Sequence, residues 1–297
     1  MRAVIAAALA LGLGALQPDA ARVLADMRQA LGGDAAIAAV QAFSVSGTES
    51  HNFGGHVSSA SLEVMVVLPD SFLRVRRMST PLGNDMMASG FRGDARIQRR
   101  ASDLPYPPDP FQGETPDQRA ARDAAFVRYL KHDFSRFAIA LIGIPAVDPL
   151  DVSHEAQRLI GGKMCDVLRL RASDGYSAAL AVDVATHLPV MVSWIAPPMV
   201  TVTSTSVVAV PSSRGQPPAT MPVPPPPPPS FPAGDPTAGL APVEYQLYFE
   251  DFKLADGLNW PHRFVEKTGD RVWTTTRLGK FKLNPTIDPK HFDPARR

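Results

Sequence analysis

Three arginines close together are the charged residues of this chain with the clearest potential for chemistry. Arg74 and Arg76 fall on one face of the alternating segment SFLRVRRMST, and Arg77 falls on the other. A guanidinium group binds a phosphate or carboxylate through two parallel hydrogen bonds, which makes Arg74 and Arg76 candidates to contact an anionic head group. Because neither face of the segment is purely apolar, the strand either lies near a solvated edge of a sheet or lines a mixed cavity.

A set of aromatic and other apolar residues could bury an apolar ligand. A stripe at helical spacing and several strand-type segments supply the candidates, which are Phe126, Leu130, Phe134, Phe137, Met87, Trp194, Tyr245, Leu247 and Phe249. Each buried methylene contributes roughly 0.8 kcal/mol, so such a cavity could hold an acyl chain without any specific polar contact. The alternative interpretation is a plain hydrophobic core, because most buried apolar residues only pack.

The sequence contains no catalytic or metal-binding motif. His51 and His56 are five residues apart without a third ligand at metal spacing, and neither HExxH nor GxSxG occurs. The single cysteine, Cys165, allows no intramolecular disulfide and no CxxC motif. We expect it to be a small buried strand residue. Neither an enzyme, a metal site nor a cofactor is therefore predicted.

The elements that would position these residues are mostly antiparallel strands. The segment Val243 to Phe252 alternates apolar and polar residues, Asp256-Gly257 is a turn pair, and Pro261 is expected at the start of the following strand. The same pattern recurs in the segments 42–50, 60–80, 85–92, 163–172, 177–184, 187–195, 263–267 and 271–281. One large, curved antiparallel sheet is predicted, in an α+β fold.

One long helix interrupts the strands. Thr115 is a good N-cap, Pro116 suits the first helical position, and Gln118 completes a capping box. The helix carries the aromatic stripe and is expected to stop at Gly143. A shorter helix is expected from Ala21, ending at Gly32-Gly33. A helix with one apolar stripe must cover an apolar surface, so we expect the long helix to pack on the sheet.

Composition and the N-terminus bear on location. The net charge of +1 offers no global field toward nucleic acid or anionic lipid, and nucleic acid is not an expected partner. Residues 1–20 are predicted to be a signal peptide, because the apolar run 3–16 is too short to span a bilayer. A periplasmic protein is expected, with secretion as second choice and peripheral membrane contact at most. Residues 21–297 would form a single domain, interrupted by an exposed Pro-rich insertion over 196–242.

The order of several short motifs resembles the LolA-like outer-membrane lipoprotein-sorting superfamily. The motifs are Leu31-Gly32-Gly33, Ser44 to Thr48, Leu68-Pro69-Asp70 with Phe72 and Arg74, Asp183 with His187 to Val190, Phe249 to Phe252, Gly257 to His262, and Asn284-Pro285. The resemblance implies a curved antiparallel half-barrel with helices packed on its concave face. It also implies an apolar cavity for acyl chains between helices and sheet.

The leading hypothesis from the sequence is a periplasmic carrier of a lipid or of the acyl chain of a lipoprotein, acting without a covalent step. One alternative is a cell-envelope module that contacts a protein partner through the Pro-rich insertion. Another is an enzyme on the same scaffold, which would need a cluster of titratable residues inside the cavity. If Phe134 lines the ligand cavity, Phe134→Glu should abolish lipid uptake and leave the sheet folded.

Overall fold

The structure is a computed structural model that describes residues 19–53, 56–81, 83–103, 113–143, 150–198 and 241–296. The chain divides into two compact units. One comprises Met1–Trp194 and Glu244–Arg297, and the other comprises Ile195–Val243. The first unit contains the fold described below. The predicted signal peptide lies almost wholly outside the described residues, and so does nearly all of the predicted Pro-rich insertion.

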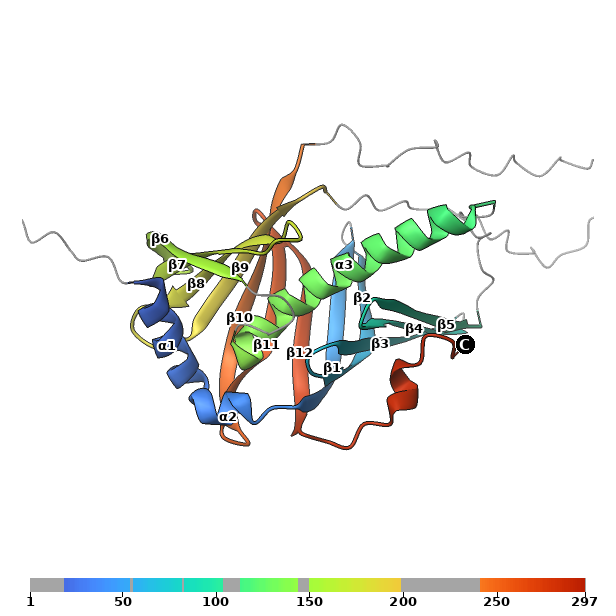
Figure 1. Cartoon of the computed structure of the whole chain (residues 1–297), viewed down its shortest axis with the longest axis horizontal. Helices are drawn as coiled ribbons and strands as arrows, with labels where there is room; N and C mark the ends of the chain where they lie inside the picture. The colour runs from blue at the N-terminus through green and yellow to red at the C-terminus, as the bar shows by residue number, and fades with distance from the viewer. Residues whose placement is uncertain are drawn as a thin grey trace, which may run out of the picture. The chain divides into compact units, whose positions relative to one another are not determined.

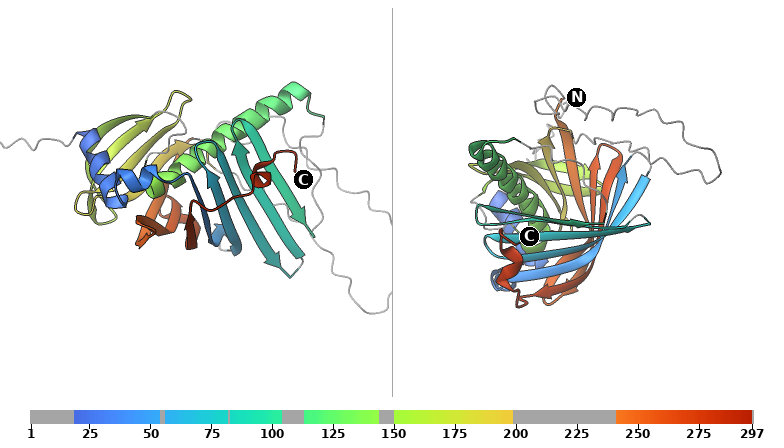
Figure 2. Two further views of the ribbon diagram at one scale, coloured as in Figure 1. Left: turned by 60° about the horizontal axis from the view of Figure 1, so that its bottom comes forward. Right: turned by 90° about the vertical axis from the view of Figure 1, so that its right-hand side faces the viewer.

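Twelve antiparallel strands form one open, curved sheet in the described part of the chain (Figures 1 and 2). They are β1 Ala42–Phe53, β2 His56–Val67, β3 Ser71–Thr80, β4 Gly83–Arg92, β5 Ala95–Ser102, β6 Asp151–Ile160, β7 Lys163–Arg171, β8 Ser177–Asp183, β9 Pro189–Ala196, β10 Val243–Ala255, β11 Leu258–Thr268 and β12 Arg271–Leu283. Their order is β5-β4-β3-β2-β1-β12-β11-β10-β9-β8-β7-β6. The predicted curved antiparallel sheet is confirmed.

The strand order explains why α3 must cross the sheet. Strands β5 and β6 are the two edges, and α3 (Pro116–Ile142) is the helix that lies between them in the sequence. Its 27 residues span about 40 Å, and it runs along the concave face (Figure 2). The predicted capping box is present, because the Gln118 amide donates to Thr115 and the Thr115 amide donates to the Gln118 side chain. The other helical elements are α1 Ala20–Leu31, α2 Asp34–Ala38 and the 3₁₀ turn η1 Pro289–Phe292.

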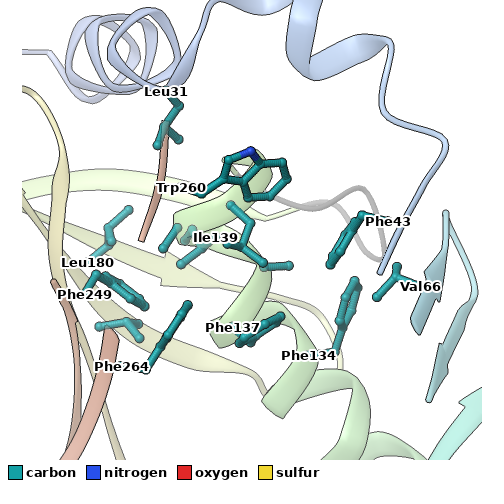
Figure 3. Close-up of a cluster of buried hydrophobic side chains, with 14 of the residues drawn as sticks. Leu31, Phe43, Val66, Phe134, Phe137, Ile139, Leu180, Phe249, Trp260 and Phe264 are labelled. Carbon is teal, nitrogen blue, oxygen red and sulfur yellow. The ribbon is translucent and has the colours of Figure 1, made fainter. Parts of the chain in front are cut away.

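Aromatic rings of α3 pack against the concave face of the sheet (Figure 3). The Phe134 ring lies 5.2 Å from that of Phe72 and 6.1 Å from that of Phe91. One turn later, Phe137 stacks on Phe264 at 5.0 Å. The stripe predicted along this helix therefore forms part of the main hydrophobic core.

The position predicted for Pro261 is wrong, because β11 begins three residues earlier at Leu258. Pro261 lies inside the strand, opposite Phe252 of β10. Pairing of β11 with β12 starts only at Arg263. The missing amide of Pro261 therefore removes no hydrogen bond from the β11–β12 ladder.

No helix among the described residues combines the length and apolar character needed to cross a lipid bilayer.

Candidate functional site

A cavity of about 70 Å³ lies between α3 and the concave face of the sheet. One part of its wall is apolar and is made by Leu62, Val64, Phe137, Trp194, Leu247 and Phe264. The other part is charged and is made by Glu49, Arg74, Arg76, Asp133 and Glu266. We call these five residues the charged cluster. It places three carboxyl groups, which were not predicted from the sequence, beside the two predicted arginines.

Strand alternation explains why the two arginines face this cavity. The Phe72 ring contacts Phe134 of α3, and Arg74 and Arg76 follow it at period two on the same face of β3. Two further strands, β4 and β5, lie between β3 and the sheet edge. The solvated-edge interpretation is therefore wrong, and the strand lines a mixed cavity. Arg77 faces the other way and pairs with the exposed carboxylate of Glu63 at 3.3 Å.

Two ion pairs organise the charged cluster. Arg74 Nη2 lies 2.8 Å from Asp133 Oδ2, which ties α3 to the sheet. Glu49 Oε1 lies 2.6 Å from both Arg76 Nε and His51 Nε2. Burial raises the pKa of Glu49, but the hydrogen bond from His51 and the charges of Arg76 and Arg74 outweigh it and lower the pKa to about 2. Glu49 is therefore a fixed negative charge at neutral pH.

Glu266 has the opposite electrostatic character. The pKa of Glu266 is raised to about 7. Burial is the largest cause of this rise, and the negative charges of Asp133 and Glu49 add to it. The positive charges of Arg74 and Arg136 lower this pKa and offset only part of the rise. The carboxylate of Glu266 forms no salt bridge within the described residues. Glu266 therefore exchanges a proton near neutral pH, inside a cavity.

We expect Glu266→Gln to raise the free energy of unfolding by about 2–3 kcal/mol at pH 8 and to change it little at pH 4. The pKa of this carboxyl is about 7 in the folded protein against an ordinary value of 4.5. Between these values the folded state binds more protons than the unfolded state, so wild-type stability falls as the pH rises through 7. Urea denaturation at both pH values measures the change. Glu244→Gln, at an exposed position of β10, is the control, and an equal effect of Glu266→Gln at both pH values would contradict the assignment.

Arg136 of α3 lies beside the cavity wall. Its side chain is buried, with 8% exposure, and its guanidinium carbon lies 4.2 Å from the ring centroid of Trp194 and 5.7 Å from that of Tyr176. The Nε atom of Arg136 has no hydrogen-bond partner among the described residues. This is a buried cation held by aromatic faces.

Sequence reasoning missed four polar residues of this region, Glu49, Asp133, Arg136 and Glu266. A usable signal did exist within single elements. Asp133 and Arg136 flank the aromatic stripe of α3, and Glu266 follows Phe264 at period two. What no local pattern supplies is their meeting, because they come from three elements far apart in the sequence.

The predicted apolar site residues separate into three groups. Phe137, Trp194 and Leu247 line the cavity, together with the predicted Arg74 and Arg76. Four others are buried and do not line it, and these are Leu130, Phe134, Tyr245 and Phe249. The last two do not line it either. Phe126 is half-buried beside Arg96, and Met87 is 38% exposed on β4 and lines a separate pocket.

Residues of the short motifs support the fold more than the cavity. A Cβ at Gly32 would lie only 2.5 Å from the carbonyl oxygen of Gly257, so the end of α1 packs closely on the β10–β11 turn. The Trp260 indole donates to the carbonyl of Ala255 at 3.0 Å. The Asn284 side chain accepts from the amides at 41 and 42 and donates to the carbonyl of Ala39. The hydrogen bonds of Asn284 therefore hold the chain where it enters β1.

Metal and thiol chemistry find little support in the part of the chain that the structure describes. No group of three histidine, cysteine, aspartate or glutamate side chains could hold a metal ion there. Cys165 lies on β7 and is fully buried, as predicted. Burial raises the pKa of its thiol to about 11, so it stays protonated at neutral pH.

Comparison with solved structures identifies the fold. No family model and no curated protein matches the sequence. A LolA superfamily protein from Nitrosomonas europaea matches with a TM-score of 0.50 at 11% identity, covering 93% of this chain and 98% of that one. The fold is LolA-like. At 11% identity the match shows the fold alone, so the resemblance noted in the sequence is confirmed for the fold.

Two further structures match with lower TM-scores. A DUF1329 family protein from Desulfovibrio piger matches at 0.47 and 12% identity, covering 93% of this chain and 98% of that one. A putative outer membrane lipoprotein-sorting protein domain from Vibrio parahaemolyticus matches at 0.45 and 11% identity, covering 92% and 95%.

Proposed function

We propose that this LolA-like chain is a periplasmic protein that binds an amphiphilic ligand, a lipid or the acyl chain of a lipoprotein, between α3 and the concave face of the sheet. One observation supports this above all, namely that a single cavity joins an apolar wall to a charged wall. The apolar wall of Phe137, Trp194 and Leu247 suits a hydrocarbon chain. Arg74 and Arg76 suit the head group.

The size of the cavity has a consequence for the mechanism. A dry cavity of about 150 Å³ accommodates benzene, whereas this one measures about 70 Å³ and is too small for an acyl chain. Uptake of a chain therefore requires α3 to move away from the sheet. The Arg74–Asp133 ion pair and the stacking of Phe137 on Phe264 oppose that movement. Burial of methylene groups, at roughly 0.8 kcal/mol each, offsets the loss of these contacts.

Native mass spectrometry of protein purified without detergent tests the proposal. We expect a co-purified mass in the lipid range that solvent extraction removes. Leu247→Asp places a charge on the apolar wall and should weaken lipid binding at least tenfold. Leu254→Asp is the matched control, because Leu254 lies on the same strand and is 76% exposed. An apo mass for the wild type, together with no uptake of fatty acid or phospholipid, would contradict the proposal.

Glu266 favours a second candidate function, acid–base catalysis on the same scaffold. A carboxyl with a pKa of about 7 in a cavity has the protonation equilibrium that general acids and bases use. Turnover of a bound ester or amide amphiphile that Glu266→Gln abolishes, with binding retained, would favour this function over simple carriage.

A further inference from the structure

One face of α3 borders the cavity. Tyr129, Asp133, Arg136 and Phe137 recur at intervals of four, three and one, which places them along one side of the helix. Asp133 and Phe137 line the cavity directly. Arg136 lies next to them against Trp194, whose ring is another part of the wall. Arg136 does not line the cavity itself, but its guanidinium lies against an aromatic ring that does.

The three guanidinium groups around the cavity differ in their ion pairing. Arg74 pairs with Asp133 through Nη2 alone, and Arg76 pairs with Glu49. Among the described side chains, no carboxylate lies within ion-pair distance of Arg136, although it is nine-tenths buried and its Nε lacks a partner. A buried charge without a partner is costly, so the protein gains stability when an anion arrives there.

We propose that the cavity binds the anionic head group of an acidic amphiphile, a carboxylate or a phosphate monoester, against the guanidinium groups of Arg136 and Arg74. This inference rests on the proposed function, because the apolar part of the ligand is taken to lie along the concave face. Stacking on Trp194 fixes the plane of the Arg136 guanidinium, so less side-chain entropy is lost when it binds oxygen atoms.

Glu266 makes this binding dependent on pH. The charged and titratable groups that interact electrostatically with its carboxyl are Asp133, Arg136 and Tyr129 of α3, Arg74 of β3 and Glu49 of β1. On β12, Glu266 is paired with the uncharged Thr274. A bound anion adds a negative charge next to Glu266, which then takes up a proton. Anionic ligands should therefore bind at least fivefold more tightly at pH 6 than at pH 8.5.

Calorimetric titration of the full-length protein with three ligands of equal chain length tests the inference. Laurate and lauryl phosphate are anionic, and monolaurin is neutral. We expect the better anionic ligand to bind at least tenfold more tightly than monolaurin at pH 6. The anion that binds more tightly identifies the source of the head group, fatty acid or lipid phosphate. Arg136→Gln should remove the preference for the anionic ligand without changing the affinity for monolaurin. Arg263→Gln is the control and should leave that preference intact, because Arg263 lies on the opposite face of β11 from Glu266.

The possible outcomes separate the inference from the proposed function. Equal affinities for the three ligands, unchanged by Arg136→Gln, would overturn the inference and leave a neutral lipid carrier. Failure of all three ligands to bind would overturn both. If Arg136→Gln does not fold, Glu266→Gln decides the matter through its pH profile. The preference for the anion should then be the same at pH 6 and pH 8.5, and a pH dependence retained by Glu266→Gln would overturn the inference.

Discussion

Replacement of Glu49 by glutamine is expected to lower the free energy of unfolding at pH 7 by about 3–5 kcal/mol. The Glu49 side chain is buried, and its carboxylate is the anion that neutralises Arg76 and contacts His51. The substitution keeps the shape of the side chain and removes its charge. Arg76 would then be a cation without a carboxylate partner on the wall of the cavity, and Arg136 is already such a cation behind Trp194.

The pH dependence distinguishes this charge effect from a packing effect. The pKa of Glu49 is lowered to about 2, so the carboxylate stabilises the folded state above its ordinary pKa of 4.5. That contribution is lost as the pH falls from 4.5 to 2. Urea denaturation should therefore give a difference between wild type and Glu49→Gln that shrinks over this range. Glu63→Gln is the control, because the exposed ion pair of Glu63 with Arg77 stabilises the fold by roughly 1 kcal/mol at most. A difference that is constant with pH would exclude the charge effect.

Truncation of Phe134 to alanine is expected to cost about 3–5 kcal/mol of stability. Phe134 is 1% exposed and its ring packs against both Phe72 and Phe91, so the substitution leaves a void that rigid neighbours cannot close. Thermal or urea unfolding followed by circular dichroism measures the loss. A loss below about 1 kcal/mol would mean that α3 does not pack on β3 and β4 as described.

Phe126→Ala is the matched control for this substitution. Phe126 lies two turns earlier on α3 and is only half-buried, packing against the core and contacting Arg96 and Tyr129, so a loss of about 1 kcal/mol is expected. The same packing changes the expectation for Phe134→Glu. A carboxylate against two buried rings finds no partner, so this variant is expected to unfold. Leu247→Asp, on the cavity wall, is therefore the better probe of lipid binding.

Local sequence patterns predicted much of the fold because each depends on a few neighbouring residues. The capping box at Thr115 and Gln118 is present as predicted, since both hydrogen bonds form within one turn. Strand alternation placed Arg74 and Arg76 on one face of β3. The error at Pro261 arose because the first residues of β11, up to Pro261, are paired with β10 only, and proline is tolerated at such a position inside a strand.

The candidate site was only partly predictable. Arg74 and Arg76 were predicted because a guanidinium group binds phosphate or carboxylate, and Phe137, Trp194 and Leu247 because they are apolar. Glu49 and Glu266 were not, because an isolated acid in an alternating strand is ordinary. Their significance depends on the pairing of β1 and β11 with the same strand, β12, through Glu49–Thr276 and Glu266–Thr274.

The sequence by itself determined the periodicities of this protein, and hence which side chains share a face of a strand or helix. The tertiary structure alone decided which faces meet. Residues 49 and 266 are more than two hundred positions apart, and they become neighbours only because β12 pairs with both β1 and β11. The pKa of each then follows from burial and from nearby charges, so one carboxyl is held near 2 and the other near 7. The chemistry of the cavity is therefore a property of long-range contacts, which no local pattern contains.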